Sequence, residues 1–152
     1  MKGIMTHIES EFSFPKDLIE RATKAALMYQ KETLDVDLSI VLTDDARLKE
    51  LNRDYLGIDA PTDVLSFPAS ETDPETGARY IGDILISIPR AQEQARAAGH
   101  PLESEVQLLV AHGVLHLLGH DHSEPEEKAR MWKAQAEILA QLGLADIQIR
   151  EE

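Results

Sequence analysis

The chain has 152 residues and a mass of 16.9 kDa, which is enough for one hydrophobic core and too little for two ordinary domains. Hydrophobic residues make up 43% and charged residues 28%, a balance that excludes a disordered or fibrous chain and predicts one globular domain over residues 1–152. The formal charge of -13 disfavours long-range attraction to nucleic acid, although a local group of basic side chains can still bind a phosphate backbone.

Three further features of the composition limit the compartment and the chemistry. No apolar stretch approaches the roughly 20 residues that span a bilayer, so no membrane association is expected. The first residues lack the pattern of an export signal, which predicts a cytoplasmic location. Because the sequence has no cysteine, a metal ion must be bound by histidine or carboxylate side chains.

The N-terminal part of the chain alternates between the two kinds of regular structure. Alternating apolar residues predict strands, and apolar residues at helical spacing predict amphipathic helices. The expected elements are a strand over 4–12, a helix over 17–29 after Pro15, a strand over 36–42, and a helix to about 55 with Thr43 as its N-cap.

The middle of the chain predicts a short strand, a polar loop and a longer strand. The short strand covers residues 64–67 and is expected to end at Pro68, because proline cannot donate a hydrogen bond to a neighbouring strand. Residues 69–79 are polar and include a proline and a glycine, which favours a loop. Residues 80–88 are the most strand-like run because they are rich in isoleucine.

The C-terminal part predicts helices only. Pro89 begins a helix that Gly99 ends. Pro101 begins the next helix, which is apolar around most of its circumference and stops at Gly119, so it is expected to lie buried at the centre.

A last helix is expected after a capping-box pattern formed by Ser123 and Glu126. Its apolar stripe reaches Leu142, and the indole of Trp132 is expected to pack and not to take part in function. The order of all elements predicts an α+β domain in which helices pack on a small mixed sheet around a buried central helix.

Four of the six histidines fall within residues 112–122, HGVLHLLGHDH, and two of them, His112 and His116, interrupt an otherwise apolar helix. His112 and His116 are four residues apart, so both imidazoles leave the same face of the helix. Gly119 lets the chain turn left-handed and bring His122 toward that pair. Three neutral imidazoles and a fourth position open to water are typical of catalytic zinc. We therefore predict one Zn²⁺ ion on His112, His116 and His122, although nickel, cobalt and copper suit the same ligands.

Two residues beside the third histidine leave alternatives open. His120 alternates with His122, so it is expected to point away or to line the mouth of the site, and it is the alternative third ligand. Asp121 either orients a ligand imidazole through its carboxylate or caps local backbone amides.

The ligand spacing H-x-x-x-H-x-x-G-x-x-H is also that of the metzincin metallopeptidases. In those enzymes the residue after the first histidine is a glutamate that acts as general base, whereas here it is Gly113. Glycine has no group that accepts a proton. A metallopeptidase is therefore an alternative function and not the preferred one.

With glycine at that position, HGVLHLLGHDH resembles the histidine signature of the YbeY family, bacterial metal-dependent endoribonucleases that mature ribosomal RNA. Every fixed position of the family pattern H-G-x-L-H-L-x-G-x-D-H is present. The segments LNRDYLGIDAPTDVLSFP at 51–68 and IGDILIS at 81–87 are similar to two further family segments and lie in the expected order. The resemblance thus covers most of the chain.

The resemblance implies an α+β domain that binds zinc through the three histidines. It also implies that the domain cleaves single-stranded or ribosomal RNA and associates with the ribosome or its small subunit. It also implies that residues 62–67 and 81–87 line a cleft leading to the metal. One position differs: the family has arginine where this chain has Leu56, and that arginine helps to hold phosphate. Arg53, one helical turn earlier, is the candidate substitute. A metal-binding ribosome assembly factor without catalytic activity is the alternative that Leu56 favours.

Overall fold

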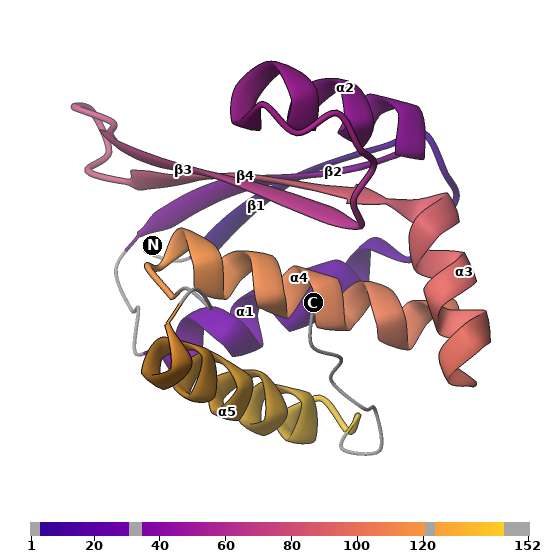
Figure 1. Ribbon diagram of the computed structural model, residues 1–152. Coiled ribbons are helices and arrows are strands. Elements are labelled where there is room, and N and C mark those ends of the chain that lie inside the picture. Colours follow the sequence, from indigo (N-terminus) through magenta and orange to yellow (C-terminus); the bar gives the residue numbers. More distant parts are fainter. Residues whose placement is uncertain (1–3, 31–34, 121–123, 145–152) are drawn as a thin grey trace.

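The computed structural model describes residues 4–30, 35–120 and 124–144, whose helices and strands form layers around one sheet (Figure 1). This arrangement confirms the predicted α+β class. The elements in chain order are β1 (Ile4–Ser10), α1 (Lys16–Tyr29), β2 (Val36–Thr43), α2 (Asp45–Leu56), β3 (Val64–Thr72), β4 (Arg79–Ser87), α3 (Ile88–Ala98), α4 (Leu102–Leu117) and α5 (Pro125–Gln141).

The sheet is mixed and has the strand order β1-β2-β4-β3. β1 pairs with β2 and β2 pairs with β4 in parallel, whereas β3 runs antiparallel to β4. β1 and β3 therefore lie at the two edges of the described sheet.

The helices cover the two faces of the sheet unequally. In Figure 1, α2 lies alone above the sheet, whereas α1 and α4 lie directly below it and α5 lies further below. The main core fills the lower side, where buried side chains of β2 and β4, such as Ile40 and Ile84, meet α1 and α4. The upper side has a small cluster of three buried leucines, which are Leu48, Leu65 and Leu85.

The helix α4 is the central helix that its composition predicts. Twelve of its 16 residues are buried, so it has no broad solvent-facing side. It contacts α1, α3, α5 and the strands β3 and β4. No helix in the described part of the chain is both long enough and apolar enough to cross a membrane.

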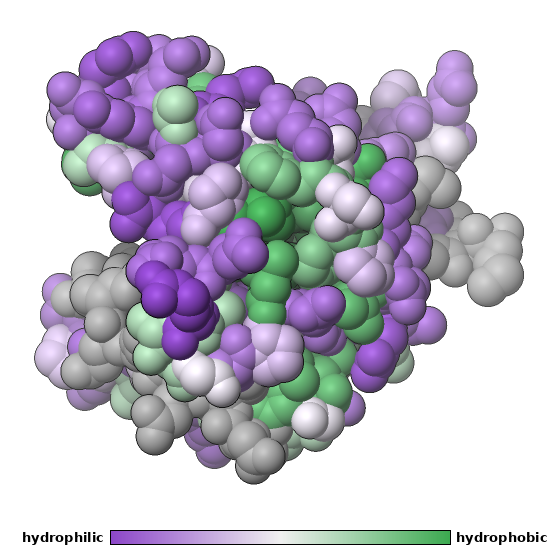
Figure 2. Space-filling view, turned by 90° about the vertical axis from the view of Figure 1, so that its right-hand side faces the viewer, coloured by the Kyte–Doolittle hydropathy of each residue, from purple (hydrophilic) through white to green (hydrophobic). Residues whose placement is uncertain are grey.

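The surface reflects the composition. Figure 2 views the molecule from the side of α3 and shows polar residues over most of the upper part, with a band of apolar residues below them.

The strand β3 is longer than the sequence predicts. It continues past Pro68 to Thr72, and the register between β3 and β4 shifts between Pro68 and Glu71. An edge strand with such an irregularity tolerates proline, because the missing N–H need not face a neighbouring strand. The predicted loop over 69–79 was therefore too long, since residues 69–72 belong to β3 and Arg79 belongs to β4.

Two predicted N-caps were wrong. The cap of α2 is Asp44, whose Oδ1 accepts a hydrogen bond from the backbone N–H of Arg47 at 2.8 Å. Thr43 is instead the last residue of β2, and its hydroxyl donates to Glu11. The cap of α5 is Glu124 in place of Ser123, which lies outside the described residues, and Pro125 follows as the first helical residue.

Candidate functional site

His112 and His116 face each other on the last turns of α4. Their Nε2 atoms are 3.1 Å apart, and their ring centroids are 4.6 Å apart. Two nitrogen ligands of one tetrahedral zinc ion lie about 3.3 Å apart, because each is about 2.0–2.1 Å from the metal. The pair therefore has the spacing of two ligands of one ion, and without metal the same distance suits an N–H···N hydrogen bond.

Gln135 on α5 fixes the orientation of the His112 ring. Its Oε1 atom lies 2.6 Å from Nδ1 of His112, and the residue is only 1% exposed. When Nδ1 carries the proton and donates it to this oxygen, the Nε2 lone pair of His112 is left free to face His116. Metal-binding histidines are commonly held in this way by an oxygen behind the ring.

Sequence reasoning missed Gln135, although one signal was present. The core-facing stripe of α5 includes Met131, Ala134 and Ile138, and Gln135 lies four residues after Met131. A glutamine beside such a stripe needs a partner for its polar groups when it is buried. The partner lies on another helix, 23 residues earlier in the chain.

The chain turns after α4 as predicted. Gly119 has φ of 100°. The N–H of His120 donates to the carbonyl of Leu115 at 2.9 Å, and the N–H of Gly119 donates to that of His116 at 3.0 Å. These two bonds form a Schellman motif, in which glycine takes the left-handed conformation that a side chain would strain. The helix therefore stops within one turn of His116.

The predicted third ligand His122 and the predicted carboxylate Asp121 lie outside the described residues. The described residues alone contain no group of three histidine or carboxylate side chains placed to hold a metal. His122 therefore stays the predicted third ligand, and Asp121 keeps both of its predicted roles.

His120 lies against α5. It lines a hollow of about 220 Å³ together with Glu127 and Arg130, and neither His112 nor His116 lines that hollow. Burial lowers the pKa of the His120 imidazole, and the positive charge of Arg130 lowers it further. Both causes favour the neutral ring.

Gly113 faces the sheet and not an open site. A Cβ atom at this position would lie 2.8 Å from Cγ2 of Ile84, closer than side chains can approach without movement. The helix α4 thus approaches β4 where only glycine fits. In metzincin metallopeptidases the general base occupies the position of Gly113, and a glutamate side chain at this position would clash with the buried side chain of Ile84.

The edge strand β3 passes beside the histidine helix. The hydroxyl of Ser66 lies 3.4 Å from the carbonyl oxygen of Gly113, at the outer limit of a hydrogen bond. On the neighbouring strand, a Cβ at Gly82 would lie 2.7 Å from Leu117 of α4. The segments predicted to line a cleft, 62–67 and 81–87, therefore lie mostly within β3 and β4, the two strands that pack next to α4.

Arg53 and Leu56 lie on α2, on the opposite face of the sheet from α4 (Figure 1). The Arg53 side chain is 53% exposed, and its Nε donates to Asp54 at 3.1 Å. This hydrogen bond raises the pKa of the guanidinium group. The sheet separates α2 from the histidine pair. The contact of Arg53 with phosphate stays a prediction, which can be tested by measuring the RNA affinity of an Arg53→Ala variant.

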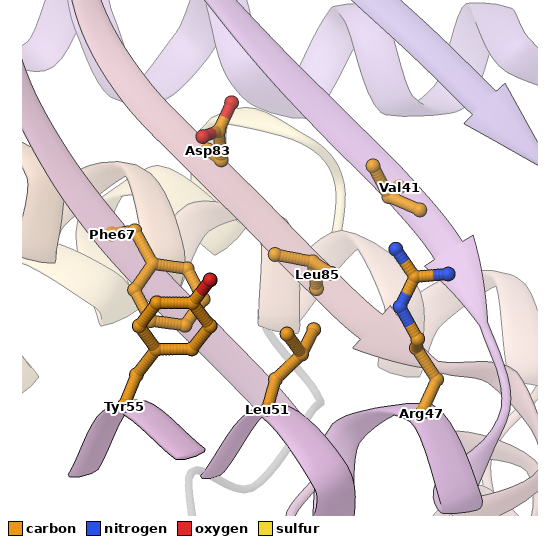
Figure 3. A pocket seen from close by; sticks show the side chains of 7 residues that line it. All are labelled: Val41, Arg47, Leu51, Tyr55, Phe67, Asp83 and Leu85. Atoms are coloured by element: carbon orange, nitrogen blue, oxygen red, sulfur yellow. The ribbon is translucent and has the colours of Figure 1, made fainter.

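A second hollow, of about 410 Å³, lies between α2 and the sheet (Figure 3). The rings of Tyr55 and Phe67 meet edge to face at one end, with centroids 5.6 Å apart. Arg47 and Asp83 supply its charged groups, and the remaining lining is aliphatic. The lining contains no histidine, so this hollow is separate from the histidine pair.

Comparison with known proteins places the chain in a family. Residues 5–143 match the family described as Endoribonuclease YbeY, a span from β1 to the residues just after α5. The chain belongs to the YbeY endoribonuclease family. This membership confirms the resemblance carried by the histidine signature.

Individual relatives agree with the family assignment. The chain is 46% identical over 134 residues to Endoribonuclease YbeY of Roseiflexus sp. strain RS-1, which covers 84% of both chains. It is 42% identical over 142 residues to Endoribonuclease YbeY of Desulfitobacterium hafniense strain Y51, which covers 90% of both. The solution structure of TM1509 from Thermotoga maritima matches with a TM-score of 0.59 and 28% identity, covering 97% of this chain and 99% of that one.

Proposed function

We propose that this protein is a zinc-dependent endoribonuclease that cuts single-stranded RNA and acts in ribosomal RNA maturation, in contact with the ribosome or its small subunit. The observation that carries the proposal is the pair of Nε2 atoms of His112 and His116, 3.1 Å apart, with Gln135 behind the His112 ring. Membership of the YbeY endoribonuclease family supplies the reaction class.

Zinc fits the donor set. His112 and His116 would hold the ion, with His122 as the third ligand, and imidazole nitrogens without thiolates suit zinc. When bound, the ion supplies Lewis-acid chemistry that activates water and polarises a phosphoryl group. The side chains of the protein provide the geometry for this chemistry: Gln135 keeps the proton of His112 on Nδ1, and the fully buried Leu115 anchors the helix turn between the two histidines.

A second candidate function is ribosome assembly without cleavage. The observation that favours it is Leu56, which takes the place of the family arginine and is 56% exposed. An aliphatic side chain cannot stabilise the charge that develops on a phosphate. In this second function the protein would still bind the metal ion but would not cleave RNA.

The test is a cleavage assay with purified protein, offered single-stranded RNA, duplex RNA and casein, with and without a chelator. We expect cleavage of single-stranded RNA only, and only with metal. The His116→Ala variant should lose bound zinc in elemental analysis and lose cleavage. The matched control is His7→Ala, because His7 is an exposed histidine on β1.

Three results would change the proposal. RNA cleavage by metal-free His116→Ala protein would contradict the role of zinc. Cleavage of casein would support the metallopeptidase. Zinc binding and ribosome binding without cleavage would support the assembly factor.

A further inference from the structure

Three side chains of α5 form a strip directed toward the histidine pair. Lys128, Trp132 and Gln135 are four and three residues apart, so they share one face of the helix. Gln135 contacts His112 directly. The Trp132 ring centroid lies 6.1 Å from that of His112, with the planes at 80°, and Nζ of Lys128 lies 5.7 Å from the indole centroid.

The strip runs from the interior to the surface. Gln135 is buried, whereas Trp132 and Lys128 are both partly exposed. Part of the indole packs against the main core, as the sequence predicts. Its Nε1 atom is buried, so the accessible surface of the Trp132 side chain consists of ring carbon atoms. Apolar surface of the indole is therefore accessible to solvent at a residue whose ring lies 6.1 Å from that of His112.

We propose that Lys128 and Trp132 form the RNA-binding rim of the histidine site, where the ammonium group contacts a phosphate and the indole stacks on the base of a neighbouring nucleotide. This inference rests on the proposed ribonuclease function and names the part of the site that recognises its substrate. Aromatic side chains bind unpaired bases without regard to sequence, because every base has a flat π face. In duplex RNA the bases are already stacked, so such a rim selects single strands.

The negative charge around the strip makes the positive charge of Lys128 important for binding a phosphate chain. The protein carries a formal charge of -13, and the first turn of α5 contains Glu126 and Glu127. A phosphate chain approaching His112 would meet repulsion there. Lys128 follows these two glutamates directly in the chain, and its ammonium group lies 5.7 Å from the indole centroid, so it brings a positive charge to the same end of the helix.

The test uses the fact that Trp132 is the only tryptophan of the chain. The zinc-loaded protein is titrated with a short single-stranded RNA made resistant to cleavage by phosphorothioate linkages, while tryptophan emission is recorded. We expect saturable quenching by the single strand and none by a duplex of the same sequence. Unchanged emission at saturating single-stranded RNA would overturn the proposal.

Variants test the two side chains separately, with affinity measured by anisotropy of a labelled RNA. Trp132→Leu should bind about tenfold more weakly, and Trp132→Phe should recover part of the loss. Lys128→Gln should bind more weakly and lower the slope of log affinity against log salt by about 0.7. Lys133→Gln is the matched control, because Lys133 is an exposed lysine on another face of the same helix.

The outcomes separate this proposal from the ribonuclease function. Wild-type affinity in both Trp132→Leu and Lys128→Gln would overturn the rim even if unmodified RNA is cut. The predicted losses of affinity, found in a protein that cuts no RNA, would support the rim and contradict the ribonuclease. If Trp132→Leu does not fold, as circular dichroism would show, the emission titration and Lys128→Gln decide.

Discussion

The two faces of the sheet are covered by different numbers of helices. The lower face, covered by α1, α4 and α5, is called the deep face, and the upper face, covered by α2, is called the thin face. Below the sheet, α1 and α4 enclose the main core and α5 adds a further layer. Above it, α2 packs on the sheet through a cluster of three buried leucines, one of them its own, and leaves a hollow of about 410 Å³ (Figures 1 and 3). The histidine pair belongs to the deep side. Side chains that must meet at one ion need neighbours that fix their rotamers, and α4 has such neighbours on several sides. The deep face therefore holds the histidine pair in a fixed arrangement, whereas the thin face leaves a hollow between α2 and the sheet.

The largest expected effect comes from removing a leucine on each face. Leu115 lies in the main core and Leu48 in the small cluster under α2, and both are fully buried. We expect Leu115→Ala to lower the free energy of unfolding by about 4 kcal/mol and Leu48→Ala by about 2 kcal/mol, because a thin layer can collapse into the space. Urea unfolding measures both values. Equal losses would show that the two faces are packed equally well.

A smaller effect is expected where α4 meets β4. Gly113→Ala places a methyl group against Ile84, and overpacking of this kind costs about 1–3 kcal/mol, partly offset by the better helix propensity of alanine. In the double variant Gly113→Ala/Ile84→Ala, the new methyl group fills part of the cavity. The double variant should therefore lose less stability than the sum of the single losses. Additive losses would mean that the two side chains do not meet.

The sequence predicts the deep face better than the thin one, because apolar patterns report burial. The pattern of α4 predicts its central position, and the spacing of His112 and His116 predicts their convergence. The pattern cannot tell which face of a sheet a helix covers. The pattern therefore does not show that α2, which carries Arg53, lies across the sheet from the histidine pair, and the phosphate contact of Arg53 stays a prediction.

Errors at the ends of elements have a similar cause. Pro68 ends a strand only where its missing N–H faces a neighbour, and strand order decides this. Thr43 and Asp44 are both good N-caps, and the choice depends on where β2 ends. Gln135 was missed because its partner His112 lies on another helix. Pairings between elements distant in sequence are not visible in local patterns.

Gln135 offers a test of how the deep face holds the histidines. Gln135→Leu should lower zinc affinity about 10–100-fold, because the His112 ring loses the oxygen that orients it. Gln135→Glu keeps an oxygen at the same place and should retain most of the affinity. Competition with a coloured chelator measures the values, and Gln141→Leu is the matched control at an exposed position of α5.

Stability separates this positioning role from a structural one. The Nε2 atom of Gln135 is buried and has no hydrogen-bond partner within the described residues. Gln135→Leu removes this unpaired donor but also takes the acceptor away from Nδ1 of His112, so the two effects oppose each other and the free energy of unfolding of the metal-free protein should change little. A variant that is less stable yet binds zinc as tightly as the wild type would contradict the positioning role.

The smallest effect is expected at the ion pair that joins α2, the helix on the thin face, to α3. Asp45 at the start of α2 accepts two hydrogen bonds from Arg90 of α3, both at 2.8 Å. The hydrogen bonds from Arg90 lower the pKa of the Asp45 carboxyl. The side chains of Arg90 and Asp45 are 35% and 38% exposed, so solvent screens the pair and its contribution is below about 1 kcal/mol.

The sign of the pH dependence follows from the lowered pKa of Asp45. The stabilisation is fully present above the ordinary aspartate pKa of about 4 and is lost as the pH falls through the lower pKa of the folded state. Arg90→Gln should therefore be less stable than the wild type at pH 7 and equally stable in strong acid. Arg96→Gln is the control, since its pair with Glu93 lies on α3 alone and is 73% and 64% exposed. A difference between Arg90→Gln and wild type that persists in acid would show that Arg90 joins α2 to α3 by packing and not by charge.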